Sequence, residues 1–325
     1  MLAACYSTSG PAAGKLDVRE LPDPSPAPGE VLVRVAVSGV NPTDWKARGA
    51  GALTVAPGDL VTPNQDGAGT IEAVGEGVDP GRVGTRVWLY NAQWQRVGGT
   101  AAQWIALPSE QAVALPDSAS FDLGASLGIP AMTAHRCLFS DGELPLATPV
   151  LVHGGAGAVG HAATELAVWR GLRVAATVSS DEKAALARDA GAQLVVNYRT
   201  EDVAAAVSEW APDGVARVVD VDLAGNLAVN ASVLAAGGVI SGYAGAGAST
   251  ELPRPLMLRN ARVEFVLVYT IPDDAKAAAV ADITRALQDG ALTTLPLHRY
   301  ALSEIAAAHD AVKGGVVGKV LVDIP

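Results

Sequence analysis

A glycine-rich turn at residues 154–160 follows directly on a short, mostly apolar run at 150–153 (VLVH). The turn contains the pattern G-x-G-x-x-G, which begins at Gly155. In this pattern the glycines permit a tight turn, the close approach of a backbone to a diphosphate, and close packing of a helix on a strand. The helix expected at 159–170 offers the unpaired N–H groups of its first turn to an anion. The sequence therefore predicts a dinucleotide site formed by Gly155, Ala156, Gly157, Ala158, Val159 and Gly160.

Strand and helix patterns alternate after this turn. Strands are expected at 150–153, 173–178, 193–197, 215–221, 238–241 and 263–268. Helices are expected between them at 159–170, 180–190, 201–210 and 225–235. Buried strands that alternate with helices indicate a parallel sheet covered on both faces. This context favours a doubly wound nucleotide-binding domain at 123–270, although a chain with 35 glycines also forms such turns without a ligand.

The first 122 residues have a different character. Short runs rich in β-forming residues at 31–37, 70–74 and 86–90 are separated by turn clusters, which predicts a compact barrel-like domain. In the tail, 271–325, we expect helices at 274–289 and 303–313 and a last strand at 318–323.

Composition excludes several classes of protein. Half of the chain is hydrophobic and 18% is charged, so it can bury a sizeable core. The formal charge of -11 makes binding to nucleic acid or to an anionic membrane unlikely. We find no run of about 20 apolar residues and no pattern typical of a signal peptide, so we expect a cytoplasmic protein. The two cysteines, Cys5 and Cys137, cannot form a four-cysteine zinc site.

The end of the second strand of the nucleotide-binding unit indicates the cofactor. NAD enzymes usually carry Asp or Glu there to hold the ribose 2′-hydroxyl. This chain has Ser179 and Ser180, with Lys183 one turn into the next helix. Hydroxyls and a lysine attract a 2′-phosphate, so we predict NADPH. Asp181 and Glu182 leave the preference open to test, because either could turn inward.

Several ordered motifs resemble one family. They are Ser38–Lys46 (SGVNPTDWK), Pro63–Gly69 (PNQDGAG), Glu72–Gly75, Leu127–Ala134 (LGIPAMTA), the glycine turn, Asn197–Arg199 and Gly318–Val320. With these motifs the chain resembles the medium-chain dehydrogenase/reductase superfamily, in its zinc-free quinone oxidoreductase (zeta-crystallin-like) branch. The resemblance implies an α/β protein in which a GroES-like β-barrel-type catalytic domain, completed by the tail, carries an inserted Rossmann domain. It also implies a homodimer.

The chain departs from the zinc enzymes of this superfamily. Zinc alcohol dehydrogenases have Cys at the position of Asn41 and a His-Glu pair at the positions of Gln65 and Asp66. Asparagine and glutamine are poor zinc ligands, and the five histidines show no ligand spacing. We therefore expect no metal, and a hydride transfer from NADPH to a quinone or an α,β-unsaturated carbonyl.

Further site residues follow from the resemblance, position by position. Asn41 is expected near the nicotinamide ribose, and Lys46 as a group that stabilises an enolate or relays a proton to it, unless it only holds the ribose or faces solvent. The other implied cofactor contacts are Thr133, Tyr198, Gly242, Tyr243, Leu267, Val268 and Lys319. Each also has an ordinary structural interpretation, such as a helix hydroxyl for Thr133 or an edge-of-core aromatic for Tyr198.

Aromatic residues gather in the first domain, and flat rings suit a planar quinone. We predict that Trp45, Tyr90 and Trp94 line the substrate pocket, and that the segments 47–62 and 91–100 shape it. Two alternatives stay open. One is an enoyl-thioester reductase that acts in trans with a biosynthetic complex. The other is a non-catalytic protein that binds NADPH or RNA, which the acidic charge disfavours.

Overall fold

The computed structural model describes residues 1–50, 58–245 and 250–325. Their contacts divide the chain into two compact units. The first unit combines residues 1–129 with 296–325, and the second is the continuous stretch 130–295. Each unit is described by itself.

The second unit contains a six-stranded parallel sheet with the strand order β10-β9-β8-β11-β12-β13. This is the order of a doubly wound dinucleotide-binding fold, and it confirms the predicted parallel sheet. The strands are β8 (Pro149–His153), β9 (Arg173–Val178), β10 (Leu194–Asn197), β11 (Val215–Asp220), β12 (Leu234–Gly242) and β13 (Arg262–Phe265).

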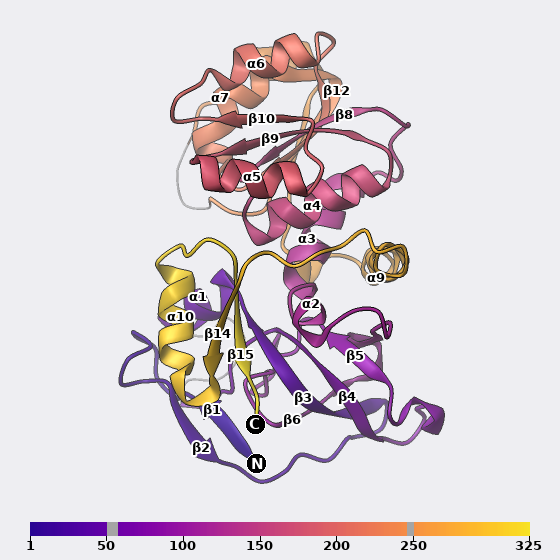
Figure 1. Cartoon of the computed structure of the whole chain (residues 1–325), viewed down its shortest axis with the longest axis vertical. Helices are drawn as coiled ribbons and strands as arrows, with labels where there is room; N and C mark the ends of the chain where they lie inside the picture. The colour runs from indigo at the N-terminus through magenta and orange to yellow at the C-terminus, as the bar shows by residue number, and fades with distance from the viewer. Residues whose placement is uncertain (51–57, 246–249) are drawn as a thin grey trace. The chain divides into compact units, whose positions relative to one another are not determined.

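Helices cover both faces of this sheet. Helices α4 and α5 lie on one face, and α6 and α7 on the other (Figure 1). The helices of this unit are α4 (Ala158–Trp169), α5 (Asp181–Asp189), α6 (Val203–Trp210), α7 (Leu223–Val233), α8 (Arg254–Leu258) and α9 (Asp273–Gln288), with a 3-10 turn, η3 (Val268–Thr270). Apolar side chains such as Leu151, Val218 and Leu227 form a core between the sheet and α6 and α7.

The first unit is built on a seven-stranded sheet with the order β14-β15-β3-β4-β5-β7, in which β6 also pairs with β3. The strands are β3 (Glu30–Val40), β4 (Asp66–Val74), β5 (Arg86–Leu89), β6 (Trp104–Pro108), β7 (Ala112–Ala114), β14 (Leu297–Ala301) and β15 (Lys319–Asp323). Val33, Ile71 and Leu89 lie in the buried core of this sheet. A separate hairpin joins β1 (Leu2–Cys5) to β2 (Asp17–Glu20).

The helices of the first unit are short. They are α1 (Pro42–Ala50), α2 (Phe121–Gly124) and α10 (Ile305–Lys313), with 3-10 turns η1 (Pro80–Arg82), η2 (Ser109–Gln111) and η4 (Leu302–Glu304). Helix α10 lies beside α1 and the tail strands (Figure 1). Helix α3 (Gly128–Phe139) starts in the first unit and continues into the second.

The division between the units differs from the expected boundaries after residues 122 and 270. Residues 123–129 belong with the first unit, where the N–H of Ile129 donates to Asp66 Oδ1 at 2.9 Å. Helix α9 belongs with the second unit, because Asp282 on it accepts hydrogen bonds from His135 and Arg170. These polar contacts join residues that are far apart in sequence. The composition of the chain does not reveal such contacts, so it does not locate the boundaries.

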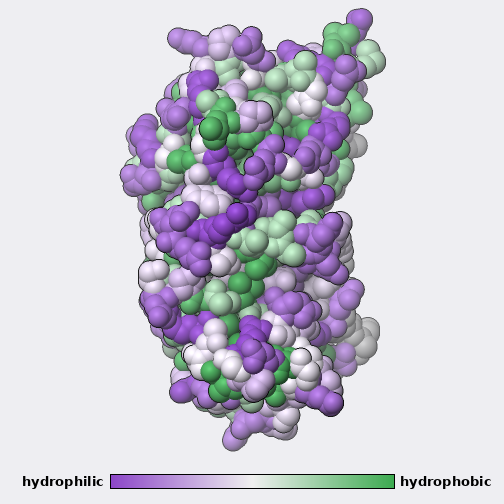
Figure 2. Space-filling view, turned by 90° about the vertical axis from the view of Figure 1, so that its right-hand side faces the viewer, coloured by the Kyte–Doolittle hydropathy of each residue, from purple (hydrophilic) through white to green (hydrophobic). Residues whose placement is uncertain are grey.

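The surface is predominantly polar where Figure 2 draws it, with hydrophobic side chains interspersed among hydrophilic ones. Within the described ranges, no helix combines the length and the apolar character needed to cross a lipid bilayer.

Candidate active site

The glycine turn connects β8 to α4, as the sequence predicts. Glycine is needed at its positions for different steric reasons. A Cβ at Gly155 would lie 2.8 Å from the Cβ of Ala176 on β9. A Cβ at Gly160 would lie 2.2 Å from the carbonyl oxygen of Gly154. Relieving this clash would require the backbone to move, at a cost in stability. These two glycines are therefore required for close packing of the helix on the sheet.

Gly157 has a different environment. Gly157 is exposed, and beyond its chain neighbours the one atom of the described residues within 4 Å of an added Cβ is the carbonyl oxygen of Gly154, at 3.3 Å. Gly157 is the N-cap of α4, and no side chain caps the helix. The N–H groups of the first turn, at Ala158 and Val159, therefore have no partner within the helix. This geometry fits an anionic group that approaches the backbone closely.

A network of buried polar side chains adjoins the glycine turn. His153, the last residue of β8, contacts the hydroxyl of Thr177 at 3.0 Å and Oδ1 of Asn230 at 2.8 Å. The Asn230 side chain donates to Asp220 Oδ2 at 2.5 Å. Burial lowers the pKa of His153, so the ring is neutral, donates from Nε2 and accepts at Nδ1. The network ties together the ends of β8, β9 and β11. Asp220 and Asn230 could not be identified from the sequence, because nothing in their spacing signals the contact.

Ser179, Ser180 and Lys183 lie together at the end of β9. The Lys183 ammonium donates to the Ser179 hydroxyl at 3.1 Å, and Ser180 caps α5 by accepting from the N–H of Lys183. Asp181 and Glu182 are exposed in the first turn of this helix. The structure thus places the Ser179 hydroxyl against the Lys183 ammonium and the Ser180 hydroxyl at the start of α5, groups that suit an anionic ligand. Tyr198 follows β10 and is 54% exposed.

A cavity of 640 Å³ in the second unit is lined by three more of the predicted cofactor contacts. It is lined by Gly242, Tyr243 and Leu267, together with apolar side chains of Leu223, Phe265 and Ile271. Thr133 and Val268 are buried and do not line it. The strand expected at 263–268 ends at Phe265, so Leu267 and Val268 lie beyond it, where the chain enters η3.

Asn41 stands at the centre of a buried cluster in the first unit. Its Nδ2 donates to Asp66 Oδ2 at 2.7 Å, and its Oδ1 accepts from Lys319 at 2.8 Å. Its backbone N–H donates to Asp44 Oδ2 at 2.6 Å. Burial raises the pKa of Asp66 to about 6 and of Asp44 to about 7, and lowers that of Lys319. Lys319, predicted as a tail contact with the cofactor, has its ammonium engaged inside this unit.

The residues at the zinc-ligand positions of related enzymes are engaged with one another or with neighbours. Gln65 exchanges hydrogen bonds with Gln93 through its side-chain amide, at 3.1 and 3.0 Å. Among residues 1–50, 58–245 and 250–325, no three His, Cys, Asp or Glu side chains gather as a metal site would require. The donors at these positions are amides and one carboxylate, a set that suits zinc poorly.

Lys46 is exposed, and its ammonium lies 5.8 Å from the ring centroid of Trp45. Lys313 on α10 lies 5.9 Å from the same centroid. Trp45 is a half-buried residue of α1, so one cation from α1 and one from α10 lie near the ring of one predicted pocket residue.

The other predicted pocket aromatics lie near β5. Tyr90 is buried with its ring centroid 5.8 Å from that of Trp88, and Trp94 is half-buried. The segment 91–100 is described in full, whereas residues 51–57 of the segment 47–62 lie outside the described residues.

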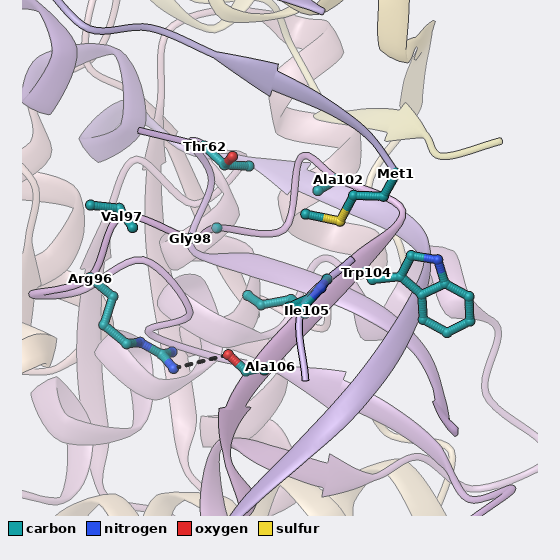
Figure 3. A pocket seen from close by; sticks show the side chains of 11 residues that line it. Met1, Thr62, Arg96, Val97, Gly98, Ala102, Trp104, Ile105 and Ala106 are labelled. Atoms are coloured by element: carbon teal, nitrogen blue, oxygen red, sulfur yellow. Dashed lines mark hydrogen bonds between the residues drawn. The ribbon is translucent and has the colours of Figure 1, made fainter. Parts of the chain in front are cut away.

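A separate cavity of 420 Å³ in the first unit does not involve these aromatics (Figure 3). Met1, Val97, Trp104 and Ile105 line it, and the Arg96 side chain beside it donates to backbone carbonyls.

Two family models match the chain. Residues 158–285 match a model described as zinc-binding dehydrogenase, and residues 27–117 match the alcohol dehydrogenase GroES-like domain. The second match supports the predicted GroES-like character of the first unit.

Relatives are similar over nearly the whole chain. The quinone oxidoreductase of Rattus norvegicus is 29% identical over 320 residues, which are 97% of this chain and 95% of that protein. The quinone oxidoreductase of Thermus thermophilus, whose structures include a complex with NADPH, is 27% identical with a TM-score of 0.82, over 99% of this chain and 100% of that chain. A mycobacterial protein complexed with NADPH is 28% identical with a TM-score of 0.83, over the same shares.

Proposed function

Because this chain belongs to the medium-chain dehydrogenase/reductase superfamily, in its quinone oxidoreductase branch, we propose that it is an NADPH-dependent reductase of quinones or α,β-unsaturated carbonyls. The observation that carries this proposal is the turn at Gly157, where a helix N-terminus without a side-chain cap begins at an exposed glycine. NADPH, when bound, supplies the hydride from C4 of its nicotinamide.

The residues of the second unit have separate tasks in binding. The first-turn N–H groups of α4 hold the diphosphate, and Ser179, Ser180 and Lys183 hold the 2′-phosphate. Tyr198 packs on the adenosine. Gly242, Tyr243 and Leu267 border the nicotinamide, in a cavity that Leu223, Phe265 and Ile271 line with apolar side chains. Thr133 faces the cofactor phosphates and Val268 borders the nicotinamide, although both side chains are buried in the chain without the cofactor.

The residues of the first unit serve the substrate end of the reaction. Asn41 orients the nicotinamide ribose, and Lys46 stabilises the developing enolate or delivers a proton to it. Trp45, Tyr90 and Trp94 supply flat surfaces for a planar acceptor. We propose that no zinc takes part, because the amide groups of Asn41 and Gln65 are weak ligands already engaged in hydrogen bonds.

A substrate panel tests the proposal. The purified protein is mixed with NADPH and with simple quinones, enones and enoyl thioesters, and the loss of NADPH absorbance is followed. We expect oxidation with quinones or enones, the same rate after dialysis against a chelator, and no stoichiometric zinc by elemental analysis. Oxidation with enoyl thioesters alone would instead assign the chain to thioester reduction, and no oxidation with any acceptor would refute a reductase.

We also propose a cytoplasmic homodimer. The edge strand β13 supports the dimer, because Val263 and Phe265 on it are 36% and 81% exposed and its outer hydrogen-bonding groups are unpaired within the sheet. Cell fractionation tests the location.

A further inference from the structure

The side-chain amide of Asn41 lies between two buried charges that come from distant parts of the chain. Lys319 begins β15, Asn41 follows β3, and Asp66 begins β4. Pairing of β15 with β3 places Val320 opposite Val40, and pairing of β3 with β4 places Gly39 opposite Asp66. Asn41, Asp66 and Lys319 are all at most 3% exposed. The sheet register therefore fixes the three side chains next to one another.

The two charges determine which way the amide points. Oδ1 of Asn41 accepts from the Lys319 ammonium, and Nδ2 donates to the Asp66 carboxylate. A 180° flip of the amide would aim its N–H groups at the ammonium and its oxygen at the carboxylate. Both contacts would then be repulsive in a medium of low dielectric constant. Only one amide orientation satisfies both partners.

The charged groups are themselves held in place. Asp66 Oδ1 accepts from the N–H of Ile129 at 2.9 Å, and a Cβ at Gly128 would lie 2.2 Å from the same oxygen. The Lys319 ammonium also donates to the carbonyl of Val40 at 3.3 Å. The carboxylate and the ammonium therefore cannot move to follow a rotated amide.

A buried pair of charges is a costly way to stabilise a fold, since apolar side chains of similar volume often serve as well. The arrangement does provide orientation. Asn41 keeps one lone pair on Oδ1 and one N–H on Nδ2 that these partners do not use, and the charges fix the direction of each.

We propose that Lys319 and Asp66 are positioning residues that hold the Asn41 amide in the orientation used to bind the nicotinamide ribose. This inference rests on the proposed function. It assigns Lys319 an action through Asn41 in place of a direct contact with the cofactor.

The test is a cycle of variants that removes the buried Lys319–Asp66 pair as a unit and keeps the buried Asp44 carboxyl in every member. Lys319→Met combined with Asp66→Asn removes both charges together, and Asn41→Ala is made in the wild-type chain and in this double variant. NADPH affinity is measured by fluorescence titration and kcat/KM by NADPH oxidation, with folding checked by circular dichroism.

We expect Asn41→Ala to weaken NADPH binding and kcat/KM about tenfold in the wild-type chain, as loss of one hydrogen bond to a ligand does. The double variant should show a similar loss. Adding Asn41→Ala to the double variant should then change either quantity less than about twofold, because residues that act through one another are not additive. Wild-type values in the double variant, or additive losses, would overturn the inference.

Two controls distinguish the proposed positioning effect from a general effect of removing charges and from a failure to fold. Arg299→Met with Asp122→Asn removes an ion pair of the same unit away from Asn41, and should leave NADPH affinity and kcat/KM within about twofold of wild type. If the Lys319 and Asp66 double variant does not fold, Asp66→Asn alone decides the matter. It keeps the shape of the side chain, should weaken NADPH binding severalfold, and should have no effect once Asn41 is alanine. A wild-type chain that binds NADPH but reduces no acceptor would refute the proposed function, while the binding cycle would still test the positioning.

Discussion

The ammonium of Lys183 lies 3.1 Å from the hydroxyl of Ser179, where β9 passes into α5. We propose that this arrangement favours NADPH over NADH. Lys183→Ala removes the cation and should weaken NADPH binding about tenfold or more, the loss typical of a charge-assisted hydrogen bond, while NADH binding stays unchanged. Parallel fluorescence titrations with the two nucleotides measure both effects. Equal weakening of NADPH and NADH would contradict the assignment of the 2′-phosphate site.

The glycine turn offers a pair of matched substitutions. Gly160→Ala forces a Cβ against the Gly154 carbonyl and should destabilise the fold by roughly 1–3 kcal/mol, as overpacking does. A Cβ at Gly157 would lie 3.3 Å from the Gly154 carbonyl oxygen, and alanine is a poorer N-cap than glycine, so Gly157→Ala should cost less than Gly160→Ala, about 1 kcal/mol or below. It should nevertheless weaken NADPH binding about tenfold, because the methyl group occupies the space of the diphosphate. Chemical denaturation and titration separate the two effects. Unchanged NADPH affinity in Gly157→Ala would argue against diphosphate binding at this turn.

His309 belongs to a buried hydrogen-bond network in the first unit, and its pKa makes the stability of the fold depend on pH. Arg48 donates to Nδ1 of His309 at 2.5 Å, and Nε2 of the ring donates to Asn64 Oδ1 at 2.9 Å. Burial, followed by the nearby Arg48 charge, lowers the pKa of His309 to about 3 from its ordinary value of 6.5. The unfolded chain therefore takes up a proton below about pH 6.5 that the folded chain refuses until about pH 3.

This difference in proton uptake gives a prediction with a definite sign. The stability that His309 contributes is present above about pH 6.5 and is lost as the pH falls, by up to about 1.4 kcal/mol per pH unit. His309→Gln keeps one donor and one acceptor but cannot titrate. Its free energy of unfolding should fall less steeply between about pH 6.5 and pH 5 than that of the wild type, as urea titrations would measure. Parallel curves for the two proteins would show that His309 is not the group responsible.

The exposed edge of β13 predicts the behaviour of one surface variant. Phe265→Asp places a charge on the strand that we propose to pair with a second copy, so it should convert a dimer to a monomer in sedimentation experiments. Leu146→Asp is the control, since Leu146 is 80% exposed and lies outside this strand. A monomeric wild type, or dissociation by Leu146→Asp as well, would contradict the proposed interface.

Much of the second unit can be predicted from sequence because each element carries its own signal. The strand expected at 173–178 coincides with β9, and the glycine turn is found between β8 and α4. These elements consist of short apolar runs and of helices that end at glycine, so local chemistry determines them.

The contacts between distant segments could not be predicted in this way. Helix α9 was expected in the first domain, but Asp282 ties it to His135 and Arg170, at separations of 147 and 112 residues. Lys319 was expected to contact the cofactor directly, and only the register of β15 on β3 reveals that its ammonium contacts Asn41. Periodicity reports which face of an element is buried, but it does not report the partner of a buried polar group.

The tail strands have a consequence for synthesis of the protein. The second unit is one continuous stretch, so it can fold as soon as residue 295 has left the ribosome. The first unit has to wait, because β15 pairs with β3, and both Leu2 and Pro325 bond to Gln103. During translation the flank of β3 that β15 later covers stays open, and an open strand flank invites pairing with other nascent chains. Covering β3 until residues 319–323 have emerged should therefore limit such pairing.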